Sequence, residues 1–308
     1  MSDRTALVAF ARESIARGSK SFAAASRLFD RTTRERVWLL YAWCRKCDDM
    51  ADGQDHGGVM ATVSDPQERL AVIRELTSRA LRGESTGEQA FDALGVVARE
   101  CGLSLAMAND VIEGFALDAA QWHPRRESDL YRYCFHVAGA VGVMMAVVMG
   151  VRPDDHATLD RACDLGLAFQ LANIARDIEE DDAAGRCYLP DDWLAELDIG
   201  PGEHMRPHNR PKLALMARWL ADEAGQYEAS ARIGAVDLPF RARWAVLAAA
   251  GIYGDIARKV RQAGEHAWDR RLFTSRKEKL RWVWKALADA IANNPRDTNR
   301  EGLWTRPR

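Results

Sequence analysis

Residues 164–182 read DLGLAFQLANIARDIEEDD, which combines an apolar helical face with a polar one. The polar side chains recur at helical spacing, at Gln170, Asn173, Asp177 and Asp181. Polar groups inside an otherwise apolar helix need partners, because burial without them is costly. The stretch therefore predicts a helix that carries a ligand site, with an arginine at position 176 beside the carboxylates. A solvated acidic face is the alternative for residues 179–182.

A second segment, residues 41–52 (YAWCRKCDDMAD), repeats this arrangement. On a helix, Tyr41, Arg45, Asp48 and Asp52 fall on one stripe. Like charges one turn apart destabilise an isolated helix, and a divalent cation would turn this repulsion into binding. The alternative is a solvated helix end before a turn.

Together, the two segments predict two helices that each present carboxylates with an arginine close by. Mg²⁺ usually binds through one or two carboxylates together with phosphate oxygens and water. Arginine offers a planar fork that suits phosphate oxygens. The pattern predicts a site for a diphosphate with an apolar tail, holding either two diphosphates or one that is clamped from both sides.

The rest of the chain predicts an all-α fold in one domain, residues 1–308, with a loosely ordered tail over about residues 293–308. Hydrophobic residues make up 47% of the sequence and charged residues 29%, as in chains that bury a sizeable core. No segment alternates apolar and polar residues as a strand would. Helical periodicity recurs at 4–17, 32–52, 66–81, 88–101, 104–121, 128–149, 156–182, 211–232, 239–267 and 275–293.

Charge and cysteine content narrow the class of protein. The net charge of -2 argues against a nucleic-acid partner, which would need a basic surface. The N-terminus lacks the apolar stretch of a signal peptide, and the six cysteines suggest reduced thiols in the cytoplasm. The apolar window from Cys134 to Val151 is expected to be a buried core helix. Cys44 and Cys47 form a Cys-x-x-Cys without a second pair, so a redox or zinc role is disfavoured.

With these motifs in order, the sequence resembles the squalene and phytoene synthase family, and within it most closely the bacterial phytoene synthases. The resemblance covers nearly the whole chain. Its landmarks are Gly18–Phe22, Tyr41–Asp52, Glu113–Asp118, Tyr133–Gly142, Ala168–Asp181 and Gly185–Pro190.

The resemblance implies an isoprenoid-synthase helical bundle around a central cavity, and it implies a role for each matching residue. Asp48 and Asp52 match a first metal-binding motif, and Asn173, Asp177 and Asp181 match a second. The residues that match diphosphate-contacting or cavity positions are Ser19, Ser21, Tyr41, Arg45, Tyr133, Gln170, Arg176, Tyr188, Tyr253 and Arg271.

The implied reaction condenses two geranylgeranyl diphosphates, through prephytoene diphosphate, to phytoene in carotenoid biosynthesis. It implies Mg²⁺, with Mn²⁺ as a substitute, and no NADPH. Neighbouring carotenoid enzymes are expected partners. Within the family, the alternative is a squalene or dehydrosqualene synthase that uses farnesyl diphosphate. We expect the small Ser26, one helical turn after Phe22, to leave room for the longer tail.

Two readings from other classes remain. A di-iron carboxylate bundle would need Glu-x-x-His pairs, which the sequence lacks. A non-catalytic helical adaptor would bind no metal or diphosphate.

The sequence also raises the question of membrane contact, because Arg276–Lys285 combines five basic residues with Trp282 and Trp284. An interfacial helix at the inner face of the membrane competes there with a helix that packs its tryptophans inward, which we favour.

Overall fold

The computed structural model describes residues 3–53, 65–120, 122–293 and 299–308, without the side chains of Lys20 and Ser21. Within these residues every regular element is helical, as the sequence predicts. The described chain divides into two compact units. Unit 1 comprises residues 1–120 and 143–159, and unit 2 comprises residues 121–142 and 160–308. The prediction of one domain over residues 1–308 stays a prediction.

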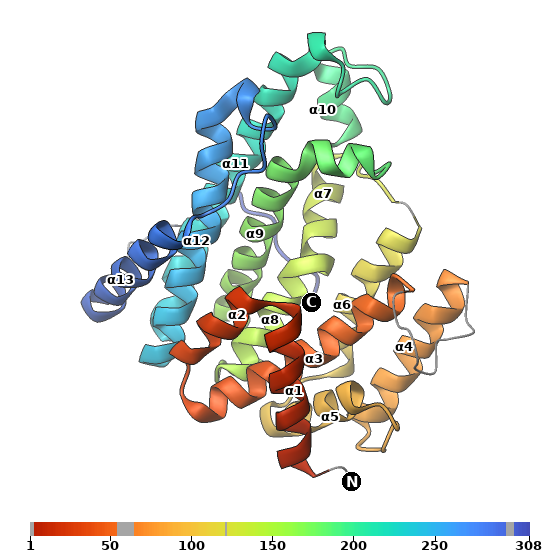
Figure 1. Ribbon diagram of the computed structural model, residues 1–308, viewed down its shortest axis with the longest axis vertical. Coiled ribbons are helices and arrows are strands. Elements are labelled where there is room, and N and C mark those ends of the chain that lie inside the picture. The colour runs from red at the N-terminus through yellow and green to blue at the C-terminus, as the bar shows by residue number, and fades with distance from the viewer. Residues whose placement is uncertain (1–2, 54–64, 121, 294–298) are drawn as a thin grey trace. The chain divides into compact units, whose positions relative to one another are not determined.

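Unit 1 is built around α3, which packs against α1 and α5, while α4 packs against α5 and α6 (Figure 1). The indole of Trp43 is fully buried, and its Nε1 donates a hydrogen bond to Thr77 Oγ1 at 3.2 Å, which ties α3 to α4. The elements of this unit are α1 (Arg4–Gly18), α2 (Lys20–Ala25), η1 (Ser26–Leu28), α3 (Arg31–Ala51), α4 (Pro66–Leu81), α5 (Gln89–Cys101) and α6 (Leu105–Ala119).

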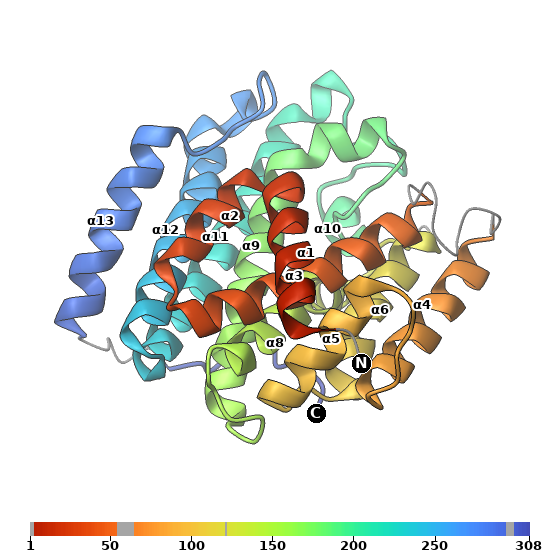
Figure 2. The same cartoon turned by 60° about the horizontal axis from the view of Figure 1, so that its bottom comes forward.

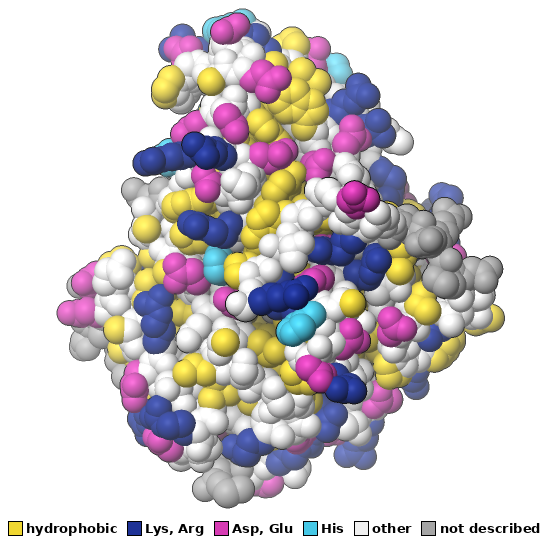
Figure 3. Space-filling view, turned by 180° about the vertical axis from the view of Figure 1, so that it is seen from behind, with side chains coloured by type: hydrophobic (Ala, Val, Ile, Leu, Met, Phe, Trp, Pro, Cys, Tyr) yellow, Lys and Arg dark blue, Asp and Glu magenta, His cyan; other side chains and the backbone are white. Residues whose placement is uncertain are grey.

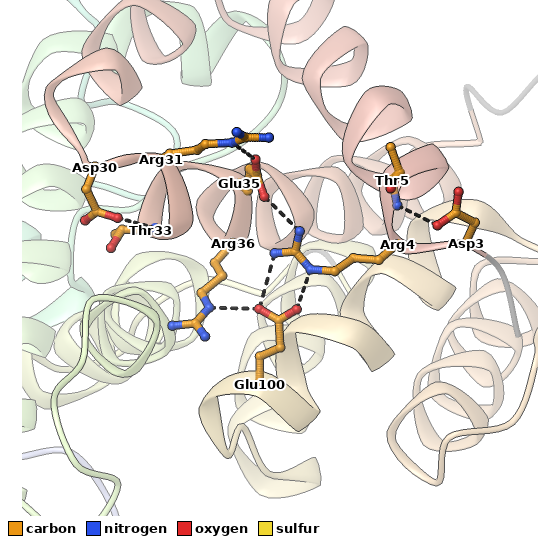
Figure 4. A network of polar contacts seen from close by, with 9 residues as sticks. All are labelled: Asp3, Arg4, Thr5, Asp30, Arg31, Thr33, Glu35, Arg36 and Glu100. Atoms are coloured by element: carbon orange, nitrogen blue, oxygen red, sulfur yellow. Dashed lines mark hydrogen bonds and ion pairs between the residues drawn. The ribbon is translucent and has the colours of Figure 1, made fainter.

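Arginines and glutamates from three helices form a polar cluster in unit 1 (Figure 4). Glu100 of α5 accepts hydrogen bonds from Arg4 Nε of α1 at 2.6 Å and from Arg36 Nε of α3 at 2.8 Å. Arg4 also donates to Glu35 of α3 at 2.7 Å. Burial opposes the ionisation of Glu100, but the bonds from the two arginines outweigh it and hold its pKa below the usual value. The cluster therefore ties α1, α3 and α5 together.

Unit 2 contains the long helices α9, α11 and α12, and α11, α12 and α13 lie side by side (Figure 2). α9 begins at residue 156, in the segment assigned to unit 1. The other elements are α7 (Glu127–Cys134), a π-helical turn η2 (Phe135–Gly139), α10 (Asp191–Glu196), η3 (Pro207–Asn209), η4 (Ala235–Asp237) and η5 (Gly264–His266). The long helices and α13 span α9 (His156–Ala183), α11 (Arg210–Gly234), α12 (Phe240–Ala263) and α13 (Arg276–Ala292).

α9 packs so closely against the segment that contains η2 that the contact positions have room only for glycine. A Cβ on Gly166 would lie 2.4 Å from the carbonyl oxygen of Ala138, and a Cβ on Gly142, in α8 (Ala140–Val148), would lie 2.5 Å from that of Ala162. The contacts are backbone on backbone, so no side-chain movement relieves them. The π-helical turn falls inside the window predicted as one helix, since periodicity alone does not reveal such bulges.

Residues 299–308 pack onto α9 and α11. Arg300 donates to both carboxylate oxygens of Asp164, at 2.7 and 2.8 Å, and Asp164 is fully buried. Arg306 pairs with Asp160 at 2.8 Å, and the backbone N–H of Trp304 donates to Tyr227 Oη at 3.2 Å. Two of these contacts are ion pairs and the third is a hydrogen bond, and each joins residues far apart in the chain, where no local sequence pattern shows them. The loosely ordered tail expected from the sequence stays a prediction. Residues 294–298 of that tail lie outside the described residues.

Charged side chains of both signs are mixed on the face shown in Figure 3, where Lys and Arg side chains alternate with Asp and Glu. The segment from Glu127 to Val148 is the one part of the described chain that is long and apolar enough to cross a membrane. Because 61% of its most apolar window is buried, it fits the core helix expected from the sequence.

Glu100→Gln should lower the free energy of unfolding by about 1–2 kcal/mol at pH 7, because two arginines lose their shared carboxylate. The pKa of Glu100 is lower in the folded state, so its contribution exists above the unfolded pKa and disappears as the pH falls through the folded one. Urea unfolding between pH 7 and pH 3 should therefore show a difference from the wild type that shrinks towards acid. Glu84→Gln, at an exposed pair with Arg82, is the matched control and should change stability less. A difference for Glu100→Gln that does not vary with pH would contradict this account.

Candidate active site

The carboxylates of the first predicted motif lie at the C-terminal end of α3. Arg45 Nη1 donates to Asp48 Oδ2 at 3.0 Å, and the same guanidinium makes two bonds to Asp49, one of them from Nε at 3.2 Å. One arginine therefore balances two carboxylates. Asp49 is not on the stripe predicted from the sequence, but Arg45 is long enough to reach it. Asp52 is exposed and ends the helix as its C-cap.

Burial and the negative charges of several carboxylates in unit 1 raise the pKa of Asp48. Burial raises the pKa of Asp48, and the negative charges of Asp52, Asp49 and Asp118 raise it further, while Arg45 opposes them. Asp118 comes from α6, so a second helix adds a carboxylate to the field around the first motif. Asp118 ends the Glu113–Asp118 landmark of the resemblance, but no spacing in the sequence links it to Asp48. A cation would relieve this concentration of negative charge.

Tyr41 connects the first motif to the start of the chain. Its ring packs edge-on against Phe22 at 5.6 Å, and its hydroxyl lies so close to Gly18 that a Cβ there would be 2.4 Å away. Burial raises the pKa of Tyr41, so the hydroxyl stays protonated and can donate a hydrogen bond. The Ser19 hydroxyl caps α2 by accepting from Phe22 N at 3.2 Å. The side chain of Ser21 lies outside the described residues.

Ser26 is held by its neighbours rather than facing an open space. It is fully buried, its hydroxyl donates to the Ala23 carbonyl at 2.8 Å, and Trp38 Nε1 donates to it at 2.9 Å. A larger residue here would displace the Trp38 indole and leave its N–H without an acceptor. Any effect of Ser26 on the length of a bound chain would therefore act through the position of Trp38.

The second motif places Asp177 of α9 between two arginines. Arg176 donates to Asp177 Oδ1 at 2.7 Å and makes a second bond to Oδ2. Arg271, which follows η5, reaches Asp177 Oδ1 at 3.1 Å and also pairs with Glu180. The structure thus brings together three residues predicted from the sequence, one of them 94 positions from Asp177. Two guanidinium groups therefore converge on the Asp177 carboxylate.

Trp268, which is not among the residues predicted from the sequence, anchors the segment before Arg271 next to Asp177. Trp268 is buried, and its Nε1 donates to the carbonyl of Ala175 at 3.2 Å, two residues before Asp177 on α9. Arg210 adds a bond to the Glu265 carbonyl at 2.6 Å and an ion pair with Asp269. This segment is therefore fastened to α9 and α11 on both sides. No local pattern in the sequence reveals the Trp268 bond, because its acceptor is a backbone carbonyl.

The predicted tyrosines of unit 2 lie in two aromatic stacks. Tyr133 of α7 stacks on Tyr188 with ring centroids 4.8 Å apart, and Trp122 stacks on Tyr133 at 5.4 Å. Trp122 is an addition to the residues predicted from the sequence. Tyr253 of α12 stacks on Phe169 of α9 at 4.1 Å. Aromatic faces of this kind attract cations, so the stacks can stabilise positive charge on an apolar ligand.

The remaining predicted residues follow the α9 stripe. Gln170, Asn173 and Asp181 are half-buried and occupy the helical positions expected from the sequence. Their roles as ligands stay predictions. The Cys44 and Cys47 thiols are free, and burial raises the pKa of Cys44 to about 12, so neither a disulfide nor a reactive thiolate is present there.

The residues present fit a divalent cation that shares its coordination with a ligand. Within the described ranges, no group of three His, Cys, Asp or Glu side chains is arranged to hold a metal by itself. Mg²⁺ is commonly bound by one or two carboxylates and by phosphate oxygens, which is the kind of partial set that α3 and α9 each offer.

Comparisons with known proteins agree on one family. The family model for squalene/phytoene synthase matches residues 15–282. The chain is 47% identical over 305 residues to a phytoene synthase of Pseudescherichia vulneris and 46% identical over 308 residues to a 15-cis-phytoene synthase of Pantoea ananas. Each alignment covers 98% of both chains. A crystal structure of a dehydrosqualene synthase in complex with ligand matches with a TM-score of 0.82 and 25% identity, over 94% of this chain and 98% of the other.

Asp177→Asn should have opposite effects on pyrophosphate binding with and without metal. Without metal, the substitution frees Arg176 and Arg271 from their counter-charge, so pyrophosphate should bind about fivefold more tightly or better. With Mg²⁺ present, the loss of a carboxylate should weaken binding. Calorimetric titration with and without Mg²⁺ measures both effects. Glu179→Gln, an exposed acid on the same helix, is the control, and an equal change in both variants would count against the arrangement.

Proposed function

This chain belongs to the squalene/phytoene synthase family, and we propose that it joins two molecules of geranylgeranyl diphosphate, through prephytoene diphosphate, to give phytoene. The observation that carries this proposal is the near full-length identity of 44–47% to bacterial proteins named as phytoene synthases. Phytoene formation would make the chain a prenyltransferase of carotenoid biosynthesis. Neighbouring carotenoid enzymes are then the partners that would consume its product.

The first step ionises one substrate by breaking its C1–O bond, and the electron pair leaves with the diphosphate. In our proposal Arg176 and Arg271 turn from Asp177 to the diphosphate oxygens and stabilise the charge that develops on them. Arg45 does the same at the first motif. Tyr41, Ser19, Ser21 and Gln170 complete the contacts to diphosphate.

Bound Mg²⁺, with Mn²⁺ as a substitute, would supply further charge neutralisation on the departing diphosphate. The carboxylates proposed to hold it are Asp48 and Asp52 on α3, with Asp177, Asp181 and the amide oxygen of Asn173 on α9. The crowding of negative charge around Asp48 supports this assignment, because such a field favours a cation.

A double bond of the second substrate molecule then attacks the allylic cation. Loss of a proton closes a cyclopropane that still carries the diphosphate of the second substrate. When that diphosphate leaves, rearrangement and loss of another proton give the hydrocarbon, so the reaction needs no reductant and no NADPH. The faces of Tyr133, Tyr188 and Tyr253 are proposed to stabilise the cations while apolar walls exclude water.

The alternative within the family is a dehydrosqualene or squalene synthase that acts on farnesyl diphosphate. The structural match to a dehydrosqualene synthase supports this alternative, but the sequence identity to that protein is only 25%. The identity to the phytoene synthase of Pseudescherichia vulneris is 47%. We therefore place the longer substrate first. We also propose a cytoplasmic location with peripheral contact at the inner face of the membrane.

Product analysis distinguishes these substrates. Purified protein with geranylgeranyl diphosphate and Mg²⁺, without NADPH, should yield phytoene, and metal chelation should abolish the product. Asp177→Asn should lower kcat by about 10²-fold or more, since it removes a group that balances charge in the transition state. Farnesyl diphosphate is assayed in parallel. A C30 product formed only from farnesyl diphosphate would overturn the substrate, and no product from either would overturn the reaction.

A further inference from the structure

The outer face of α13 exposes large apolar side chains in one stripe. Leu280 is 58% exposed, Trp284 62% and Ile291 68%. They lie four and eleven residues apart along the helix, so they share one face. Isolated apolar residues are common on protein surfaces, but an aligned set that includes a tryptophan marks an interaction surface.

The inner face of the same helix already anchors it to α12. The Trp282 ring packs so closely on Gly251 that a Cβ there would lie 2.3 Å from the ring. Trp244 Nε1 of α12 also donates to the carbonyl of Val283 at 2.8 Å. The sequence favours a helix with both tryptophans packed inward, which is correct for Trp282 and wrong for Trp284. Trp284 is thus not needed to hold the helix in place.

Basic side chains flank the exposed stripe. α13 carries five basic and two acidic residues. Lys277, Arg281 and Lys285 are exposed beside the apolar side chains. Of the acids, Glu278 pairs with Lys259 of α12 at 2.7 Å, and Asp289 lies 3.7 Å from Arg232. The outer surface of the helix is therefore positive, which complements the anionic headgroups of phospholipids.

A short loop joins this surface to the second motif. Phe273, 68% exposed, lies two residues after Arg271, whose guanidinium pairs with Asp177. The Phe273 carbonyl accepts a hydrogen bond from Lys259 Nζ at 3.0 Å, and the same amino group binds Glu278 at the start of α13. The loop is thus fixed to α12 and α13 while its phenyl ring points into solvent.

We propose that Phe273 and the outer stripe of α13 dock on the surface of a bilayer that contains anionic phospholipid. Apolar side chains flanked by lysine and arginine are the composition of helices that lie in the membrane plane. This surface rests on the peripheral membrane contact proposed above and names the residues that would make it, but it does not depend on the proposed reaction. If the chain catalyses the proposed reaction, docking places the Arg271 loop beside the lipid bilayer, which dissolves both the prenyl substrate and the hydrocarbon product.

Co-sedimentation of the full-length protein with vesicles tests the proposal without any substrate, so the result is independent of catalysis. Binding to vesicles of phosphatidylcholine with phosphatidylglycerol should exceed binding to phosphatidylcholine alone and should weaken with salt. The double variant Leu280→Ser/Trp284→Ser should weaken binding about tenfold or more. Lys277→Gln/Arg281→Gln should weaken it about fivefold per residue on anionic vesicles only.

Leu215→Ser, at a 38% exposed leucine on α11 of the same unit, is the matched control and should bind as the wild type does. Circular dichroism and thermal unfolding establish that each variant is folded. Absence of wild-type binding to anionic vesicles, or equal binding by the double variant, would overturn the proposal. A wild-type dimer that becomes monomeric in the double variant would also overturn it, because the stripe would then belong to a second copy of the chain.

Discussion

Carboxylates crowded on one helix face need a counter-charge, and this requirement organises both acidic motifs. Arg45 meets it on α3, and Arg176 with Arg271 meets it on α9. A guanidinium group also suits phosphate oxygens, and we propose that these same arginines bind the diphosphate. In our proposal a metal diphosphate would exchange these partners: the carboxylates would hold the cation and the arginines would bind the phosphate oxygens. Such an exchange would leave none of these charged groups without a counter-charge, and an unpaired buried charge is costly.

The packing of unit 2 anchors the segment that carries Arg271 to α9. Trp268 fastens the segment before Arg271 to α9, and close backbone contacts at Gly166 fasten α9 to its neighbour. Donors held in place in this way lose little freedom when charge develops on the leaving group, and preorganisation of this type is a large part of enzymatic rate enhancement. The proposed membrane surface is continuous with this segment, since Phe273 lies on the loop that carries Arg271 and its carbonyl accepts a hydrogen bond from Lys259.

Much of this could be predicted from the sequence, because helical periodicity and the spacing of acids are local properties. The long helices and the stripes on α3 and α9 follow from such patterns. The Trp268 anchor, the effect of Asp118 on Asp48 and the packing of Arg300 on Asp164 could not, since each joins residues distant in the chain. The short helix α10 was missed because six residues are too few to show a period.

The central claim is that this chain binds prenyl diphosphate through a divalent cation shared between substrate and aspartates. Calorimetric titration with a non-hydrolysable thiolodiphosphate analogue of geranylgeranyl diphosphate, with and without Mg²⁺, measures that coupling directly. The account predicts tight binding that requires Mg²⁺ and is weakened by Asp48→Asn and by Asp177→Asn. Equally tight binding without metal, unchanged in both variants, would contradict it.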